Sequence, residues 1–154
     1  MSEYTLFEYD DGGREEAGFK GEAGDCVTRA ISIATGAPYV EVRLSLMDRT
    51  SVWRNKRRSA AAKSTRGNSV RNGTRKEAYH PYLESIGWEW VPTMGIGTGC
   101  QTHLRPDELP AGRIIVRLSK HLAAVIDGVI RDTEDCSRGG TRCVYGYYRQ
   151  KQTT

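Results

Sequence analysis

Cys26 is the residue whose position in the sequence points most directly to chemistry. It follows Gly24 and Asp25 at the start of an apolar periodic segment, so it falls in the first turn of a predicted helix. Unpaired backbone N–H groups and the positive end of the helix dipole gather there, and both stabilise a thiolate. The same N–H groups can receive an oxyanion. The alternative interpretation is that Cys26 is a small buried residue beside Val27.

A thiolate nucleophile needs an imidazole partner, and the chain has three histidines, His80, His103 and His121. His121 opens an apolar run that ends at Asp127-Gly128, a strong signal for a two-residue hairpin of type I′. With that loop, Ala123 faces Asp132, and His121 lies on the same face, diagonally opposite Asp132. An aspartate so placed fixes the imidazole tautomer and stabilises its charged form. A wider turn or a β-bulge would move either His121 or Asp132 to the opposite face of the hairpin and separate the two side chains.

Three helices are expected before residue 88. The first begins after Asp25, a good N-cap, and ends at Gly36. Its apolar stripe is Val27, Ala30, Ile31 and Ala34. The second begins at Pro38, and its expected buried face is Val40, Leu44 and Met47. The third follows a T-x-x-E capping box that starts at Thr74, and it ends at Gly87. Its apolar positions are Tyr79, Tyr82, Leu83 and Ile86.

Strands follow the third helix, because the apolar period changes from 3.6 to 2 there. They are expected at residues 88–91, 113–118, 122–126, 129–133 and 143–148, with one more short strand at 4–9. Helices first and antiparallel strands afterwards predict an α+β fold, with N-terminal helices packed on a C-terminal antiparallel sheet. The 154 residues suit one domain, 1–154.

The composition excludes several classes of protein. No run approaches the roughly 20 apolar residues of a membrane span, and the first residues show no secretory signal pattern. We therefore expect a cytoplasmic protein without membrane contact, in which disulfides are not expected.

The charge is concentrated in one segment. The net charge is +4, yet nine of the 23 Lys and Arg residues lie between residues 54 and 76, which contain no acidic residue. They are Arg54, Lys56, Arg57, Arg58, Lys63, Arg66, Arg71, Arg75 and Lys76. We expect a loop from residue 51, with its basic part at about 54–73. This segment could bind the phosphates of a nucleic acid, with Trp53 stacking on a base. It could also border a cleft for an acidic substrate. The third alternative is that it is simply a solvated loop.

The remaining cysteines suggest an alternative to a catalytic site, namely a metal site. Cys100 and His103 form a C-x-x-H unit, and Cys136 and Cys143 could complete a tetrahedral zinc site. The last two cysteines are seven apart, too far for a typical zinc knuckle, and no second paired unit exists. We therefore expect no metal and no cofactor. Cys136 and Cys143 could instead pair reversibly with each other, or each cysteine could simply pack.

The motifs resemble those of papain-like cysteine peptidases. Gly24-Asp25-Cys26 opens an Ala/Ile-rich helix, His121 opens a strand and Asp132 lies on the next strand, in that family's order. The compact format resembles its bacteriocin-processing and transglutaminase-like branches. Residues 95–148 are similar to small uncharacterised bacteriophage proteins with a predicted papain-like fold. The segments that carry this resemblance are 118–121, 125–133 and 142–147, together with 25–31.

The resemblance implies roles for three residues. Cys26 would be the nucleophile, His121 the general base and acid, and Asp132 the residue that orients the imidazole. Papain-like enzymes usually place a Gln or Asn a few residues before the cysteine for the oxyanion hole, and residues 19–25 contain neither. The backbone N–H of Cys26 would then serve together with another donor, for which Gln101 is the candidate.

We therefore expect a thiol-dependent acyl-transfer enzyme, a cysteine peptidase, isopeptidase or amidase, with a protein or peptide substrate. The resemblance implies a phage-encoded protein in the host cytoplasm. The alternative is a catalytically inactive papain-like protein that binds a host protein or a nucleic acid through its basic segment.

Overall fold

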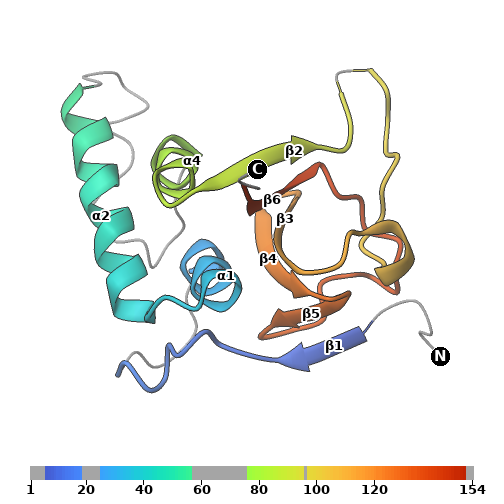
Figure 1. Cartoon of the computed structure of the whole chain (residues 1–154), viewed down its shortest axis with the longest axis horizontal. Coiled ribbons are helices and arrows are strands. Elements are labelled where there is room, and N and C mark those ends of the chain that lie inside the picture. The colour runs from blue at the N-terminus through green and yellow to red at the C-terminus, as the bar shows by residue number, and fades with distance from the viewer. Residues whose placement is uncertain (1–5, 19–24, 57–75, 96, 152–154) are drawn as a thin grey trace.

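Three α-helices of the described residues lie on one side of a six-stranded sheet (Figure 1). The structure is a computed structural model that describes residues 6–18, 25–56, 76–95 and 97–151, with the side chains of the second range described as far as residue 51. The helices are α1 (Cys26–Thr35), α2 (Tyr39–Lys56) and α4 (Lys76–Ser85). α1 packs on β4, β3 and β5, whereas α2 packs on α1 and α4, so α2 forms an outer layer.

The sheet is mixed rather than wholly antiparallel. Its strands are β1 (Leu6–Tyr9), β2 (Trp88–Pro92), β3 (Arg113–Leu118), β4 (His121–Ile126), β5 (Val129–Asp132) and β6 (Gly146–Gln150), in the order β1-β5-β4-β3-β6-β2. The α+β class is confirmed, but β1 pairs with β5 in parallel. The chain between β1 and β5 is long, so no tight turn fixes their relative direction.

The β4–β5 hairpin has the predicted register. Ile126 pairs with Val129 and Val125 with Ile130. Asp127 and Gly128 have φ values of 50° and 82°, and a type I′ turn requires positive φ at both positions. The side chains that this register brings together are therefore those expected from the sequence.

Helix α1 also follows its sequence pattern. Val27, Ala30, Ile31 and Ala34 are buried. Gly36 has φ 80°, and its N–H bonds the carbonyl oxygen of Ser32, which ends the helix. Asp25 is the N-cap residue, as expected, but its side chain makes no capping hydrogen bond.

Two predictions for the second helix are wrong. Val40 and Leu44 are 43% and 59% exposed, whereas Met47 packs against the core as expected. The buried face consists of Tyr39, Val42, Leu46 and Thr50. Both sets of positions have helical spacing, so periodicity alone could not choose between them. The expected loop from residue 51 is also wrong at its start, because α2 runs to Lys56 without a Gly or Pro to break it. Arg54 and Lys56 are thus helical, and residues 57–73 lie outside the described part.

The third helix and the last strand differ from expectation at their ends. Tyr79, Tyr82 and Leu83 are buried as predicted, and α4 contains Pro81, but Ile86 lies beyond the helix and is 38% exposed. The last strand begins at Gly146 rather than at residue 143. Its residues pair with both β2 and β3, whereas Cys143 forms only an isolated bridge with His103.

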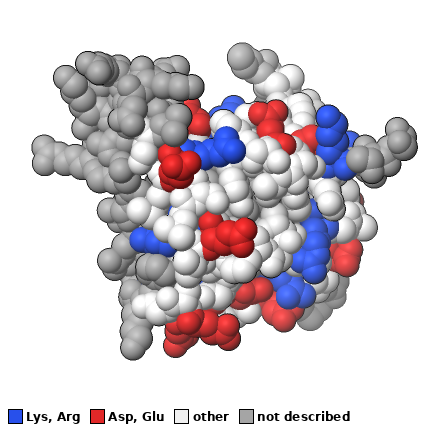
Figure 2. All heavy atoms as spheres, turned by 60° about the vertical axis from the view of Figure 1, so that its left-hand side comes forward, with Lys and Arg blue, Asp and Glu red and all other residues white. Residues whose placement is uncertain are grey.

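The described helices include none that is long and apolar enough to cross a bilayer. On the molecular face in Figure 2, acidic and basic side chains of the described residues both occur, and in places they lie next to one another. The bulk of the basic segment lies outside the described residues, so its proposed partners stay predictions.

Candidate active site

His121 and Asp132 meet at one end of the sheet. His121 begins β4 and Asp132 ends β5. The Nε2 atom of His121 lies 2.7 Å from Oδ2 of Asp132, and Asp132 is only 3% exposed. The predicted contact between these two side chains is confirmed. Because Nε2 faces Asp132, Nδ1 is the ring nitrogen left for another partner.

Cys26 supplies a thiol beside this imidazole. It is the first residue of α1, and its half-buried side chain packs against the core. Burial opposes ionisation of the thiol, but the hydrogen bond and charge of His121, a hydrogen bond from the backbone N–H of Leu122 and the charge of Arg29 together lower the pKa of Cys26. These contacts favour the thiolate.

The pKa values of the imidazole and of the carboxylate are shifted in opposite directions, and each shift favours the charged form. Burial disfavours the imidazolium, yet hydrogen bonds to Asp132, Cys136 and Cys26 raise the pKa of His121 to about 11. Burial also disfavours the carboxylate, and the bond to His121 outweighs it and lowers the pKa of Asp132. These shifts all favour the same combination of charged forms, a Cys26 thiolate, a His121 imidazolium and an Asp132 carboxylate.

Arg29 is a residue of the candidate active site that the sequence interpretation missed. It lies one turn after Cys26, is 8% exposed, and pairs with the buried carboxylate of Asp25. Its Nη2 also lies 3.5 Å from Oδ1 of Asp132. Arg14 and Tyr39 bind the other side of Asp25, with Arg14 Nε 3.0 Å from Oδ2. The helix that carries the thiol is therefore tied to the strand that carries Asp132, and only the i, i+4 spacing of Asp25 and Arg29 hinted at this.

Gln101, the candidate oxyanion donor, is not brought to this site by any hydrogen bond between described residues. Its side chain is exposed in the segment after Cys100. The other two histidines also lie elsewhere: His80 bonds the Tyr148 hydroxyl at 2.8 Å, and His103 lies 3.2 Å from Glu108. The N–H groups at the start of α1 are the oxyanion donors that remain.

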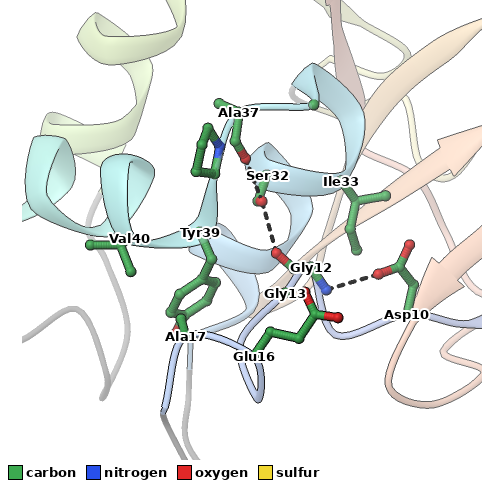
Figure 3. A pocket seen from close by; sticks show the side chains of 12 residues that line it. Asp10, Gly12, Gly13, Glu16, Ala17, Ser32, Ile33, Ala37, Tyr39 and Val40 are labelled. Atoms are coloured by element: carbon green, nitrogen blue, oxygen red, sulfur yellow. Dashed lines mark hydrogen bonds between the residues drawn. The ribbon is translucent and has the colours of Figure 1, made fainter.

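A pocket of about 460 Å³ lies away from the thiol, between the N-terminal arm, the last turn of α1 and the start of α2 (Figure 3). The Ser32 hydroxyl donates to the Gly12 carbonyl at its wall, and Asp10 and Glu16 also line it. Cys26, His121 and Asp132 do not line this pocket. It therefore adds no group to the candidate active site.

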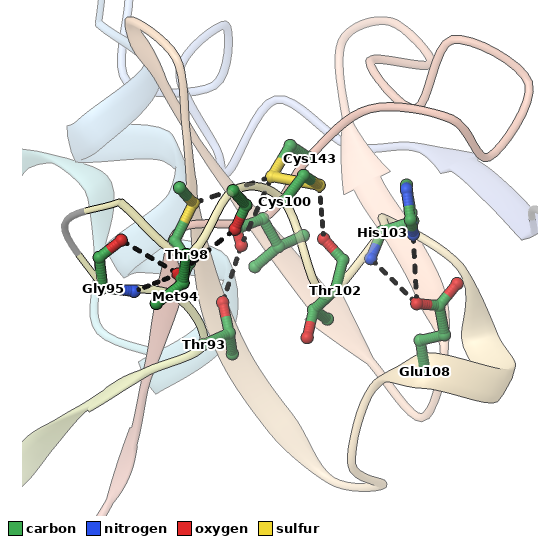
Figure 4. The surroundings of a disulfide bond; sticks show 11 residues. Thr93, Met94, Gly95, Thr98, Cys100, Thr102, His103, Glu108 and Cys143 are labelled. Atoms are coloured by element: carbon green, nitrogen blue, oxygen red, sulfur yellow. Dashed lines mark hydrogen bonds and ion pairs between the residues drawn. A yellow bond between two sulfur atoms is a disulfide. The ribbon is translucent and has the colours of Figure 1, made fainter.

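Cys100 and Cys143 form a disulfide (Figure 4), which corrects three interpretations drawn from the sequence. Their Cα atoms are 5.8 Å apart, in the ordinary range for such a bridge. The expectation of no disulfide is wrong, and the alternative pairing of Cys136 with Cys143 is wrong as well. The zinc site built on Cys100 and His103 is also overturned, because both sulfur atoms of Cys100 and Cys143 are already bonded.

We expect reduction of this disulfide to destabilise the fold. The bridge closes a loop across a sequence separation of 43, and loop entropy for that length gives a contribution of about 4 kcal/mol. The free energy of unfolding should be measured by urea denaturation for wild type and for the double variant Cys100→Ser/Cys143→Ser. A reducing agent should lower the stability of the wild type alone. Equal stability of the two proteins without reductant would contradict this expectation.

Comparisons with protein-family models, with curated proteins and with solved structures find no match to this chain.

Proposed function

We propose that the protein is a thiol-dependent acyl-transfer enzyme, a cysteine hydrolase that acts on a peptide, isopeptide or side-chain amide. The observation that carries this proposal is the placement of His121, which bonds Asp132 through Nε2 at 2.7 Å and interacts with the Cys26 thiol. A thiol at a helix start, an imidazole and a buried carboxylate are the parts that covalent acyl transfer requires. The finer assignment to a papain-like fold, and to a phage-type protein, rests on the motif resemblance alone.

Cys26, His121 and Asp132 have different roles in the proposed reaction. The Cys26 thiolate attacks the carbonyl carbon, and the developing oxyanion meets the N–H groups at the start of α1. The imidazolium of His121 then donates its Nδ1 proton to the leaving amine, which leaves a thioester on Cys26. Neutral His121 takes a proton from water, the hydroxide formed attacks the thioester, and the acid product departs with the thiolate restored. Asp132 orients the ring throughout.

Turnover by wild type and Cys26→Ala tests the proposal. Both should be offered a fluorogenic peptide library and glutamine amides, with ammonia release as the second readout, in the presence of EDTA. Thr35→Ala, at the far end of α1, is the matched control. Hydrolysis by wild type and Thr35→Ala but not by Cys26→Ala is expected. Equal turnover by Cys26→Ala, or none by wild type, would count against the enzyme and leave binding as the function.

A further inference from the structure

A second thiol meets the ring of His121. The sulfur of Cys136, a ring nitrogen of His121 and a carboxylate oxygen of Asp132 all lie within 4.8 Å of one another. Cys136 is a free cysteine and only 6% exposed. The three residues come from the start of β4, the end of β5 and the segment that follows β5. The fold, rather than a sequence spacing, assembles this cluster.

The segment that carries Cys136 is held in place. The Arg142 guanidinium donates to the Ser119 carbonyl at 2.7 Å and to the Cys136 carbonyl at 3.3 Å. It thereby ties Cys136 to the β3–β4 turn immediately before His121. The Ser137 hydroxyl and backbone N–H also donate to Asp135, at 2.6 and 3.0 Å. A thiol fixed beside an imidazole and a carboxylate is a preorganised donor set.

The donor types suit zinc. A thiolate, an imidazole nitrogen and a carboxylate oxygen are its usual protein ligands, whereas magnesium and calcium prefer oxygen alone. Oδ1 of Asp132 accepts from the Thr133 N–H at 2.7 Å and faces Arg29. Oδ2, which bonds Nε2 of His121, is therefore the oxygen that an ion would take over from that bond. Three protein ligands leave a fourth tetrahedral position for water.

We propose that Cys136, His121 and Asp132 bind a Zn²⁺ ion, and that the ion holds the active site in an inactive form. On binding, the Cys136 thiol and the imidazolium each release a proton to solvent, and Zn–S and Zn–N bonds form. The ion replaces the hydrogen bond between Nε2 and Oδ2. His121 is then a neutral metal ligand that keeps only its Nδ1 proton. It is a much weaker acid than the imidazolium, and it no longer supplies the positive charge that stabilises the Cys26 thiolate. The inhibition rests on the proposed function, whereas the binding of zinc does not.

Metal titrations test the binding without any substrate. Zn²⁺ should be titrated against a chromophoric chelator, and Co²⁺ should be followed by its thiolate charge-transfer band, in wild type, Cys136→Ser and Cys26→Ser. All proteins should be free of tags and reductant, with the disulfide intact. We expect one ion per chain in wild type and Cys26→Ser, with the charge-transfer band. Affinity should fall about 10-fold or more in Cys136→Ser, with loss of the band.

The variants Cys136→Ser and Cys26→Ser distinguish the proposed site from a metal site on the Cys26–His121 pair. If Cys26→Ser loses the ion and Cys136→Ser keeps it, the metal sits on the Cys26–His121 pair and the proposal is overturned. Failure of wild type to bind Zn²⁺ or Co²⁺ would overturn it directly. If Cys136→Ser is unfolded by circular dichroism, Asp132→Asn takes its place and should weaken Zn²⁺ binding while it keeps the cobalt–thiolate band.

The effect of zinc on the active site is tested by a separate measurement. The rate at which iodoacetamide labels Cys26 should be compared with Zn²⁺ and with EDTA, within each protein. We expect Zn²⁺ to slow labelling about 10-fold or more in wild type and to have less than a twofold effect in Cys136→Ser. Unchanged labelling of a zinc-loaded wild type would overturn the inhibition while the binding stands. Slow labelling in EDTA would instead count against the proposed function.

Discussion

The Asp132→Asn variant is expected to lower the pKa of the His121 imidazole well below its value of about 11. Burial alone would lower that pKa, and the bond to Asp132 is the largest contribution that raises it. The asparagine also no longer stabilises the imidazolium that acts as the acid in acyl transfer, so turnover should fall about 100-fold or more. NMR titration of the histidine ring resonances, in EDTA, measures the first effect, and the fluorogenic library measures the second.

Glu108→Gln is the matched control for this variant, because it removes the carboxylate partner of the more exposed His103. It should leave the titration of His121 and the turnover unchanged. If His121 titrates alike in wild type and Asp132→Asn, then Asp132 does not hold the imidazole charge and has no place in the triad.

The same shifts set the pH range in which this contact stabilises the fold. A raised histidine pKa contributes stability that is complete below the unfolded value of about 6.5, and is lost as the pH rises through about 11. A lowered carboxyl pKa contributes stability above the unfolded value of about 3.9, and this is lost as the pH falls through the lowered folded value of Asp132. The stability gap between wild type and Asp132→Asn should therefore be widest between about pH 4 and 6.5.

Arg29→Met is expected to destabilise the protein by about 3–5 kcal/mol. The arginine is 8% exposed and pairs with Asp25 and Asp132, which are 1% and 3% exposed. Without it, Asp132 loses a cationic neighbour, and Asp25 keeps only Arg14 and Tyr39 among the partners described above. Urea denaturation at pH 7, with the midpoint and slope compared to wild type, gives the loss directly.

Arg105→Met serves as the comparison for that measurement. Arg105 pairs with Asp107 and Glu108 at the surface, where removal of an ion pair costs less than about 1 kcal/mol. Similar losses in the two variants would show that the buried network around Asp25 contributes no more than a surface pair does.

The part of the site that the sequence predicted is the part fixed by local geometry. Asp127-Gly128 specifies a two-residue turn, the turn sets the register, and the register places His121 beside Asp132. The helix that carries Cys26 is likewise local, because its start follows from the N-cap position of Asp25 and the apolar period, and its end from the glycine stop at Gly36.

The parts that the sequence did not predict depend on contacts between distant segments. Cys136 reaches His121 only because the chain after β5 folds back onto the β3–β4 turn. Cys100 and Cys143 meet because His103 and Cys143 pair across an isolated bridge. The buried face of α2 is the one that contains Tyr39, whose hydroxyl donates to the distant Asp25. The apolar period of the sequence fitted Val40 and Leu44 equally well.

The most direct measurement is the rate at which iodoacetamide alkylates Cys26 as a function of pH, in wild type and His121→Ala, with EDTA present and peptide mapping to identify the site. A thiolate held by an imidazolium should react at a nearly constant rate from about pH 6 to 8. In His121→Ala the rate should rise about tenfold per pH unit, as for an ordinary thiol of pKa near 8.5. If wild type and His121→Ala give the same profile, or if Cys26 reacts no faster than Cys136 at pH 6, the thiolate–imidazolium pair does not exist and the catalytic proposal fails.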